Sequence, residues 1–465
     1  MVAAGLYNAL DVRSMHGRSR THDVHESTYA QIGNAFGRIP IVLHLGDFLQ
    51  LKPTNGIGLI EDLQARKDDG KGYIHEDISL EVNHACTLFK SIAHVFELKG
   101  TKRFVPGDPI IEFLSCMRAG QQFRDEIWKA FSETFATDAK GELDPRHADP
   151  KFRDGYGLGM YWETLARWIP RRARRDALKL GVPLIFCQCY DECSTMTRDT
   201  AARFLNQFNI HHTGHMHGVL PIHIGMRVRL TQKINATLGL VQEQKATIVG
   251  VVLHPTDQER YRRARAGEIF RPTFLPRGWW LQVDDFNQSP IWEELLPLVG
   301  PSNDGLDDTP GPSMELWHQQ QTEARARSLF FLPAMETECV FKSTDKHTVK
   351  RYGFPMTHAY YLTATASQGQ TLRAGVTIDC ARLPPQNNAE GMSDENWWLN
   401  LYVMFSRPTR MSDMLLLRPP TREFLTRGPP RSVRDQLAAF EKKIQDCIAA
   451  AEKLAEEFDF PLPPS

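Results

Sequence analysis

The chain has 465 residues, enough for about three structural units of ordinary size. Hydrophobic residues make up 42% and charged residues 24%, a composition typical of globular proteins that excludes wholesale disorder. The 55 Lys and Arg residues nearly balance the 56 Asp and Glu residues, so the net charge is −1. This balance excludes a polybasic, histone-like binder, but it allows an enzyme with one local basic groove.

The sequence also restricts where the protein works. No stretch of 18 apolar residues is present, and the N-terminal sequence lacks the apolar core of a signal peptide. The eight cysteines are mostly isolated and indicate a reducing compartment. We therefore expect a soluble nuclear or otherwise intracellular protein with no membrane partner. The chain opens inside an apolar helical pattern without a capping residue, which is what a chain that starts within a domain would show.

The first half of the chain has mixed α/β texture. The clearest element is the apolar run at 39–51, IPIVLHLGDFLQL, which predicts a buried parallel strand ending at Gly46-Asp47. Side chains just beyond such a strand face the crevice where α/β proteins bind ligands. Helices are predicted over 107–135, over 158–180, and over 194–208 with Ser194 as its N-cap. The run at 183–190 predicts a second apolar strand.

The texture changes at about 219. Alternating apolar and polar residues with many β-branched side chains predict short antiparallel strands and a small β-rich insert. The Pro- and Gly-rich stretch at 296–318 predicts a mobile loop. After 355 the α/β texture returns, with a strand at 375–383 and a helix, turn and strand over 397–419.

The last residues form a separate pattern. After Pro430, Ser432 is a plausible N-cap, and apolar residues then recur at alternating spacings of four and three. They form one seam along a helix of about 26 residues: Val433, Leu437, Phe440, Ile444, Cys447, Ala451, Leu454 and Phe458. The seam fits a helix packed on its own domain, and it also fits pairing with a partner helix through 432–458.

Three short segments carry chemistry that converges. They are GDFLQLKP at 46–53, TASQGQTL at 365–372 and YVMFSRPTR at 402–410. A strand-end Asp with a nearby Gln can hold Mg²⁺-bound water and sense a γ-phosphate, and a Ser-Gln-Gly-Gln-Thr turn offers backbone N–H groups to an anion. An arginine on a helix can supply the positive charge that phosphoryl transfer needs. Together they suggest a nucleotide held between two α/β lobes.

In this order and spacing the segments resemble the Pif family of helicases, in helicase superfamily one, which includes the helicase portions of Helitron-type transposons. Two further matches lie at 98–120, where Arg103 stands, and at 224–250 in the β-rich stretch. The resemblance runs from residue 1 to about 420. It implies an α/β fold in four parts: 1–96 as the rear of a first RecA-like lobe, 97–218 with 355–420 as the second, 219–354 as the insert, and 421–465 as a helical tail.

The resemblance also implies roles for single residues. Asp47 and Gln50 would sense the γ-phosphate and the metal, with Gly46 beside them. Arg103 and Arg407 would be charge-stabilising arginines from the second lobe. Gln368 and Gly369 would couple the bound nucleotide to the bound DNA strand. The residues expected to contact DNA are Thr371, Arg171 and Arg172. The implied cofactors are ATP and Mg²⁺, and the implied partner is single-stranded DNA.

The sequence departs from the family pattern at the residues that would bind the phosphates of ATP. The 465 residues contain no G-x-x-x-x-G-K-[ST] loop, and no Asp-Glu pair precedes the GDF segment. Ala366 stands where the family has Lys. The implied activity is an ATP-dependent 5′-to-3′ DNA helicase, and we expect this chain alone not to hydrolyse ATP. The alternative is a non-catalytic single-strand-binding or scaffold module. Repair, recombination, telomere maintenance and transposon mobility all remain open as pathways.

Four weaker groups of residues have mainly structural interpretations. Asp191-Glu192 ends an apolar strand but lies on the wrong side of the GDF segment for a metal site. Cysteines at 187–193 and histidines at 211–217 have the atoms for zinc, yet their spacing matches no common site, so no metal is expected. The arginines at 167–175 and at 260–265 can grip phosphates or form solvated faces. Trp397-Trp398 fits core packing better than base stacking.

Overall fold

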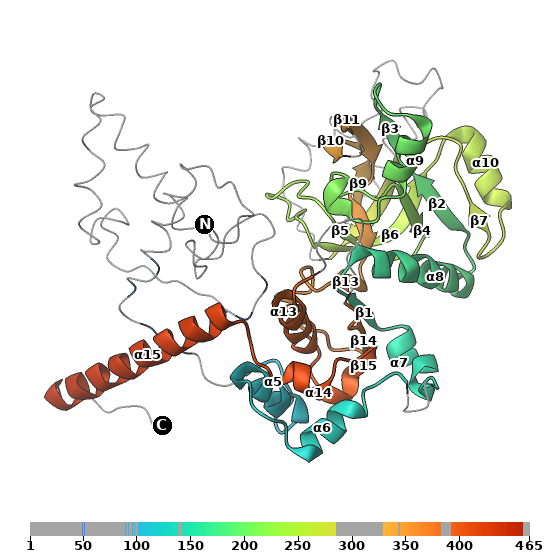
Figure 1. Cartoon of the computed structure of the whole chain (residues 1–465). Helices are drawn as coiled ribbons and strands as arrows, with labels where there is room; N and C mark the ends of the chain where they lie inside the picture. The colour runs from blue at the N-terminus through green and yellow to red at the C-terminus, as the bar shows by residue number, and fades with distance from the viewer. Residues whose placement is uncertain are drawn as a thin grey trace, which may run out of the picture. The chain divides into compact units, whose positions relative to one another are not determined.

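The computed structural model describes residues 101–137, 142–284, 329–342, 345–382 and 392–458, together with Leu49, Leu51, Phe89, Ile92, Val95 and Glu97 (Figure 1). Apart from Leu49 and Leu51, the strand predicted at 39–51 lies outside this set, as do the loop predicted at 296–318 and the residues Gly46, Asp47 and Gln50. The chain divides into two compact units. Unit 1 contains Met1–Glu133, Leu383–Met411 and Pro420–Ser465, and unit 2 contains Thr134–Arg382 and Ser412–Pro419.

Unit 1 is helical in its described part. The region predicted as helical over 107–135 forms two helices, α5 (Pro109–Ala119) and α6 (Asp125–Ser132). Gly120 ends α5 at φ 65°, a left-handed conformation that favours glycine. The later helices are α13 (Asp394–Phe405), α14 (Arg422–Leu425) and α15 (Arg431–Phe458).

An aromatic core holds α5, α6 and α13 together. Phe113 of α5 stacks on Phe131 of α6 with ring centroids 4.2 Å apart, and Phe405 of α13 meets Phe131 edge-on at 5.5 Å. All three rings are completely buried. Burial of one such ring stabilises the fold by roughly 1.5–3 kcal/mol. The core therefore fixes the end of α13, where Arg407 follows.

The tail helix α15 begins at Arg431, so Ser432 lies inside it and is not the N-cap. The carbonyl of Pro430 accepts hydrogen bonds from the Val433 and Arg434 N–H groups, each at 3.0 Å. The first part of the predicted seam packs on its own unit, since Val433 and Phe440 are buried and Phe440 meets the Phe89 ring edge-on. Pairing with a partner helix stays a prediction.

Unit 2 contains a parallel sheet in the strand order β13-β1-β14-β15. Its strands are β13 (Tyr361–Thr363), β1 (Tyr156–Gly159), β14 (Val376–Asp379) and β15 (Met414–Leu417). All neighbours pair in parallel. The helix α8 (Trp162–Leu180) follows β1 and packs against β1 and β13. This confirms the predicted α/β class and the strand expected at 375–383.

A β-rich part completes unit 2. A five-stranded antiparallel sheet has the order β12-β5-β6-β8-β9, and its strands are β12 (Met356–His358), β5 (Arg227–Leu230), β6 (Lys245–Val252), β8 (Gly278–Val283) and β9 (Leu329–Pro333). A second sheet, β10-β11-β3, joins β10 (Met335–Lys342), β11 (Lys346–Gly353) and β3 (Tyr190–Glu192). The antiparallel strands predicted from 219 onward are therefore present.

Strand pairing extends past the predicted limits of the insert, 219 and 354. The apolar strand β2 (Leu184–Gln188) pairs with β4 (Val219–Ile222) and β7 (Ile269–Phe270), and β12 pairs with β5. An apolar run predicts a buried strand but cannot indicate which sheet it joins. Three short helices lie along unit 2: α7 (Pro150–Arg153) before β1, α9 (Arg198–Leu205) between β3 and β4, and α10 (Pro255–Arg263) between β6 and β7. The N-cap of α9 is Thr197 and not Ser194, because the Thr197 hydroxyl accepts from the Thr200 N–H at 3.2 Å.

Candidate active site

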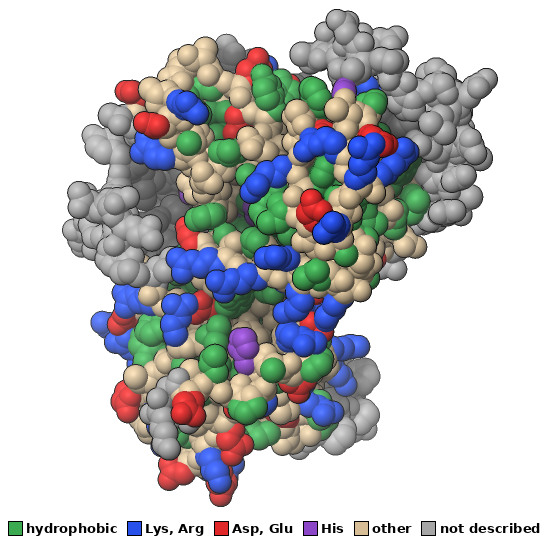
Figure 2. Space-filling view, turned by 90° about the vertical axis from the view of Figure 1, so that its right-hand side faces the viewer, with side chains coloured by type: hydrophobic (Ala, Val, Ile, Leu, Met, Phe, Trp, Pro, Cys, Tyr) green, Lys and Arg blue, Asp and Glu red, His purple; other side chains and the backbone are tan. Residues whose placement is uncertain are grey.

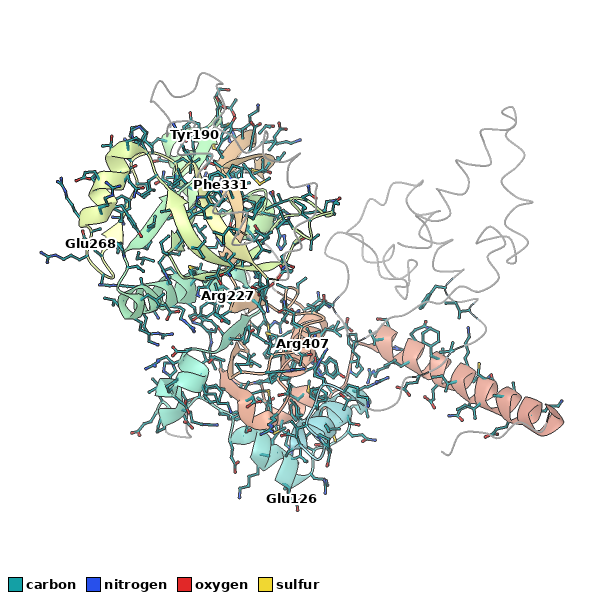
Figure 3. The ribbon with its side chains drawn as sticks, turned by 180° about the vertical axis from the view of Figure 1, so that it is seen from behind. Glu126, Tyr190, Arg227, Glu268, Phe331 and Arg407 are labelled. Carbon is teal, nitrogen blue, oxygen red and sulfur yellow. The ribbon has the colours of Figure 1, made fainter. Side chains whose placement is uncertain are left out.

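Arg407 lies directly after α13, in the interior of unit 1 (Figure 3). Only 3% of the residue is exposed. Its Nε donates to the carbonyl oxygen of Val403 at 2.9 Å, and its Nη2 donates to the Ser406 hydroxyl at 2.6 Å. The last carbonyls of a helix have no partner within the helix. The end of α13 therefore orients the Arg407 guanidinium.

Arg103 reaches the same place from far away in the chain. Its Nη1 donates to the Ser406 carbonyl oxygen at 2.8 Å, across 303 positions of sequence. Two residues further on, the Val105 N–H donates to the Thr409 carbonyl at 3.1 Å. The structure therefore brings together the two arginines that the sequence motifs single out. Both guanidinium groups therefore hydrogen-bond to Ser406, one to its carbonyl oxygen and one to its hydroxyl, at this end of α13.

Asp108 ties the Arg103 segment to the Arg407 segment. Its Oδ1 caps α5 by accepting from the Ile110 N–H at 3.0 Å, and it also accepts from the Met411 N–H at 2.9 Å. One carboxylate thus serves a helix end and a loop 303 residues away. Sequence reasoning missed this residue. The signal was available, since an Asp followed by Pro109 is typical of an N-cap before a first-turn proline.

We predict that Asp108→Ala destabilises the protein by about 1.5–5 kcal/mol. Loss of the cap costs about 0.5–2 kcal/mol, and an unpartnered Met411 N–H adds about 1–3 kcal/mol. The matched control is Asp108→Asn, whose amide oxygen can still accept both bonds. Urea unfolding measures the difference. Equal stability of the Ala and Asn variants would show that the two hydrogen bonds accepted by Asp108 do not stabilise the protein.

Gln368 and Gly369 belong to a tight turn in unit 2, just beyond the carboxyl end of β13. Ser367 anchors the turn because it is completely buried and its hydroxyl donates to the Ala364 carbonyl at 2.7 Å. Gly369 is exposed at φ 75°, and Thr371 is also exposed. Ligands of α/β proteins bind beyond the carboxyl ends of parallel strands. The turn is therefore placed where a ligand can reach its backbone.

Asp379 is a further polar group at this edge of the sheet. It is the last residue of β14, is 2% exposed, and forms an ion pair with Arg418, whose Nε lies 3.1 Å from Oδ1. Arg418 follows β15 in a left-handed conformation, φ 53°. Sequence reasoning did not single out this pair, although an Asp that ends an apolar strand is the available signal. The ion pair joins the carboxyl ends of β14 and β15.

The two arginines predicted to contact DNA have opposite environments. Arg171 is exposed, whereas Arg172 is 6% exposed and its guanidinium serves the interior. Arg172 donates to the carbonyls of Arg153 at 3.0 Å and Asp154 at 2.9 Å, and it forms an ion pair with Asp176. Consecutive helix residues point about 100° apart, so one of two neighbours can be inside. Arg172 is a structural residue and does not fit the DNA-binding prediction.

Of the three cysteines considered for zinc, Cys187 and Cys189 are buried, whereas Cys193 is only partly buried and a hydrogen bond with Thr195 lowers the pKa of its thiol. Burial raises the pKa of the Cys189 thiol to about 12, and burial also raises the pKa of Cys187, so both are protonated at neutral pH. Asp191 of the Asp-Glu pair accepts two hydrogen bonds from Arg351, both at 2.7 Å. Within the described ranges, no three His, Cys, Asp or Glu side chains lie together as metal ligands would.

His217 gives unit 2 a pH dependence. It is partly buried, its Nε2 lies 2.8 Å from the Thr357 hydroxyl, and its ring meets Trp162 edge-on. Burial, followed by the charges of Arg229 and Arg351, lowers its pKa from 6.5 to about 4. Between these values the unfolded chain binds the proton and the folded chain does not. Stability contributed by this residue is therefore lost as the pH falls from 6.5 to 4, at about 1.4 kcal/mol per pH unit.

The check is a comparison of urea unfolding between pH 7 and pH 4 for the wild type and His217→Asn. The variant removes this titration, so its free energy of unfolding is expected to fall less steeply over that range. His358 is also buried, and burial lowers its pKa as well, so part of the slope remains in the variant. Parallel profiles of the two proteins would contradict the assignment to His217.

Comparisons with known proteins can be set beside this geometry. No family model matches the sequence, and no curated protein matches it. The solved structures that the chain resembles include Pif1 helicases. A Bacteroides Pif1 bound to single-stranded DNA is 13% identical with a TM-score of 0.46, over 86% of this chain and 66% of that one. Pif1 from Candida albicans is 15% identical with a TM-score of 0.36, over 71% of this chain and 57% of that one.

The chain thus spans less than two thirds of the length of the Pif1 structures it matches. At these identities and TM-scores the comparison does not extend to residues or chemistry. Of the helices that the structure describes, none is long and apolar enough to cross a lipid bilayer.

Proposed function

We propose that this chain is part of an ATP-dependent DNA translocase with 5′-to-3′ polarity, a helicase of Pif type. The observation that carries the proposal is the convergence of Arg103 and Arg407 at the end of α13. Two guanidiniums oriented by backbone oxygens suit the equatorial oxygens of a transferring phosphoryl group, where one arginine is worth about 10³–10⁵ in rate. Their positions in the sequence are those at which the family has its charge-stabilising arginines.

The remaining parts of the site are assigned from the sequence motifs. Asp47 and Gln50 would act on Mg²⁺ and the γ-phosphate of ATP, with Gly46 as a further cofactor-binding residue. Gln368 and Gly369 lie on a turn beyond β13, and there they would relay the state of the nucleotide to the bound strand. Closure of a cleft on ATP and its reopening after hydrolysis would move the strand, because the two shapes differ in their affinity for ATP.

The printed sequence lacks the loop that holds the β- and γ-phosphates. The test therefore uses the chain extended at its N-terminus by a segment with a G-x-x-x-x-G-K-[ST] loop and an Asp-Glu strand end. With ATP and Mg²⁺, this protein is expected to unwind a duplex that carries a 5′ single-stranded tail and to leave a 3′-tailed duplex intact. If only the 3′-tailed duplex is unwound, the proposed 5′-to-3′ polarity is wrong. If neither duplex is unwound, the proposed translocase activity is wrong.

A second candidate is a non-catalytic module that binds single-stranded DNA or scaffolds other proteins. The absence of a phosphate loop from the 465 residues favours it. The two candidates differ in how DNA affinity responds to nucleotide. A motor binds single-stranded DNA with different affinity in the presence of a non-hydrolysable ATP analogue, since the two ligands are linked. A scaffold binds DNA with the same affinity under both conditions.

A further inference from the structure

The helix α8 carries a row of arginines on its outer face. Arg167, Arg171 and Arg174 are exposed, and their spacing of four and three places them on one stripe of the helix. At 1.5 Å per residue the row is roughly 10 Å long. The other basic residues of α8 are engaged: Arg175 forms an ion pair with Asp154 and so does Lys179, while Arg172 is buried. No acidic side chain in the described part of the chain pairs with the three outer arginines.

A comparison within unit 2 shows that this arrangement is particular to α8. The helix α10 is also rich in arginine, but it carries its own counter-charges. Arg262 and Arg263 each form an ion pair with Glu259, and Arg260 forms one with Asp257. The positive charge of α10 is largely neutralised locally. The charge on the outer face of α8 is available to an external anion.

The end of α8 continues the same surface. Leu178 is 55% exposed and packs beside Gly267, and exposed Ile269 lies on β7, an edge strand. Arg265 and Arg271 flank this short apolar segment and are exposed. Figure 2 faces this side of unit 2 and shows bands of Lys and Arg side chains interrupted by hydrophobic ones. The surface therefore combines several positive charges with two apolar side chains, and exposed Glu268 adds one negative charge beside Ile269.

We propose that the outer face of α8, defined by Arg167, Arg171 and Arg174, binds the phosphate backbone of duplex DNA. Duplex DNA carries one negative charge per about 1.7 Å of its axis. This charge density favours binding by a straight, rigid row of guanidinium groups. Sequence-tolerant binding of single strands relies on exposed aromatic platforms. On α8 the two tryptophans are turned inward, since Trp162 is buried and Trp168 packs on Tyr361. The row therefore fits a duplex backbone better than a single strand.

This inference takes nucleic acid as the partner from the proposed function, but it needs neither ATP nor the arginines at α13. It adds Arg167 and Arg174 to Arg171, which was already expected to contact DNA, and assigns their shared face to a duplex. In a translocase, such a contact would hold the double-stranded region while the strand moves elsewhere. Failure of ATP hydrolysis would leave the duplex contact intact, and loss of the duplex contact would leave hydrolysis intact, so the two ideas are tested separately.

The test measures affinity for a blunt 20-base-pair duplex without nucleotide, using the full chain at salt concentrations from 50 to 200 mM. The variant is Arg167→Gln with Arg171→Gln. Its matched control, Arg262→Gln with Arg263→Gln, removes the same charge from α10. The slope of log K against log salt is negative, and its magnitude is expected to decrease by about 1.8 in the variant, since each phosphate contact contributes about 0.9. In the control the slope is expected to stay unchanged. Adding Arg174→Gln is expected to bring the decrease to about 2.7.

A single strand of the same length is measured in parallel. The proposal is overturned if the variant retains the wild-type slope on the duplex, or if the α10 control lowers it as much. It is also overturned if only single-strand binding is weakened, because the face would then serve the single strand. All substituted side chains are exposed, so the variants are expected to melt at the wild-type temperature, and a melting curve for each verifies this.

Discussion

Replacement of Arg407 by alanine is expected to lower the kcat of DNA-stimulated ATP hydrolysis by about 10³- to 10⁵-fold, the contribution of one transition-state arginine. The assay uses the chain extended by a phosphate-loop segment. The Arg407 guanidinium is fixed by Val403 and Ser406 at the end of α13, next to Arg103, so its charge is already oriented before ATP binds. Preorganised charge of this kind lowers the barrier without reorganisation during the reaction.

Two controls separate chemistry from folding. Arg427→Ala removes an exposed arginine of the same unit that pairs with Asp394, and it is expected to leave kcat unchanged. Arg407→Lys retains the charge but loses the planar fork, and we expect intermediate activity. Because Arg407 is buried, the folded fraction of each variant is measured by circular dichroism. A folded Arg407→Ala enzyme with kcat within tenfold of the wild type would contradict the role of this arginine.

The second large effect is expected at Asp191, where replacement by alanine should destabilise the protein by about 3–5 kcal/mol. Arg351 is completely buried, and Asp191 accepts two hydrogen bonds from it between paired strands β3 and β11. Removing one partner of a buried ion pair leaves an uncompensated charge inside the protein. The Arg351 guanidinium lies over the Phe204 ring, with its Cζ 4.2 Å from the ring centroid, and its Nη1 donates to the Met216 carbonyl. The guanidinium is therefore shielded from water.

The double variant Asp191→Val with Arg351→Met is expected to regain most of the lost stability, because an apolar pair of similar volume needs no counter-charge. Urea unfolding of the two single variants and the double variant measures the coupling. The same experiment tests the metal alternative for Asp191-Glu192. Our account predicts that a chelator leaves the unfolding midpoint unchanged. A chelator effect that disappears in Asp191→Ala would favour a metal site at this position.

The sequence predicted most elements of the described fold because periodicity and apolar runs report burial. The helix at 158–180 and the strand at 375–383 follow from such patterns. Which sheet a strand joins is decided by partners distant in sequence, so β2 was assigned to the second lobe although it pairs with β4 and β7. Likewise, Ser194 and Ser432 are good N-cap residues, but the backbone enters the helices elsewhere.

The candidate site was predicted in part, for a similar reason. Motif order indicated Arg103 and Arg407, and the structure brings them to one helix end. Composition alone did not separate Arg171 from Arg172, since only the packing of α8 shows which side chain faces the Asp154 carbonyl. Asp108 and Asp379 act through contacts with Met411 and Arg418, residues that no local pattern connects to them. Long-range ties of this kind become visible only in three dimensions.

We propose that Arg103 and Arg407 form the arginine half of an ATP site, which also needs a phosphate loop that these 465 residues lack. The most direct measurement compares ATP turnover, with single-stranded DNA present, for the chain alone and for the chain extended by a phosphate-loop segment. We predict no turnover by the chain alone and DNA-stimulated turnover by the extended chain. An extended chain that binds ATP and DNA yet never hydrolyses ATP, or a chain that hydrolyses ATP unaided, would contradict the claim.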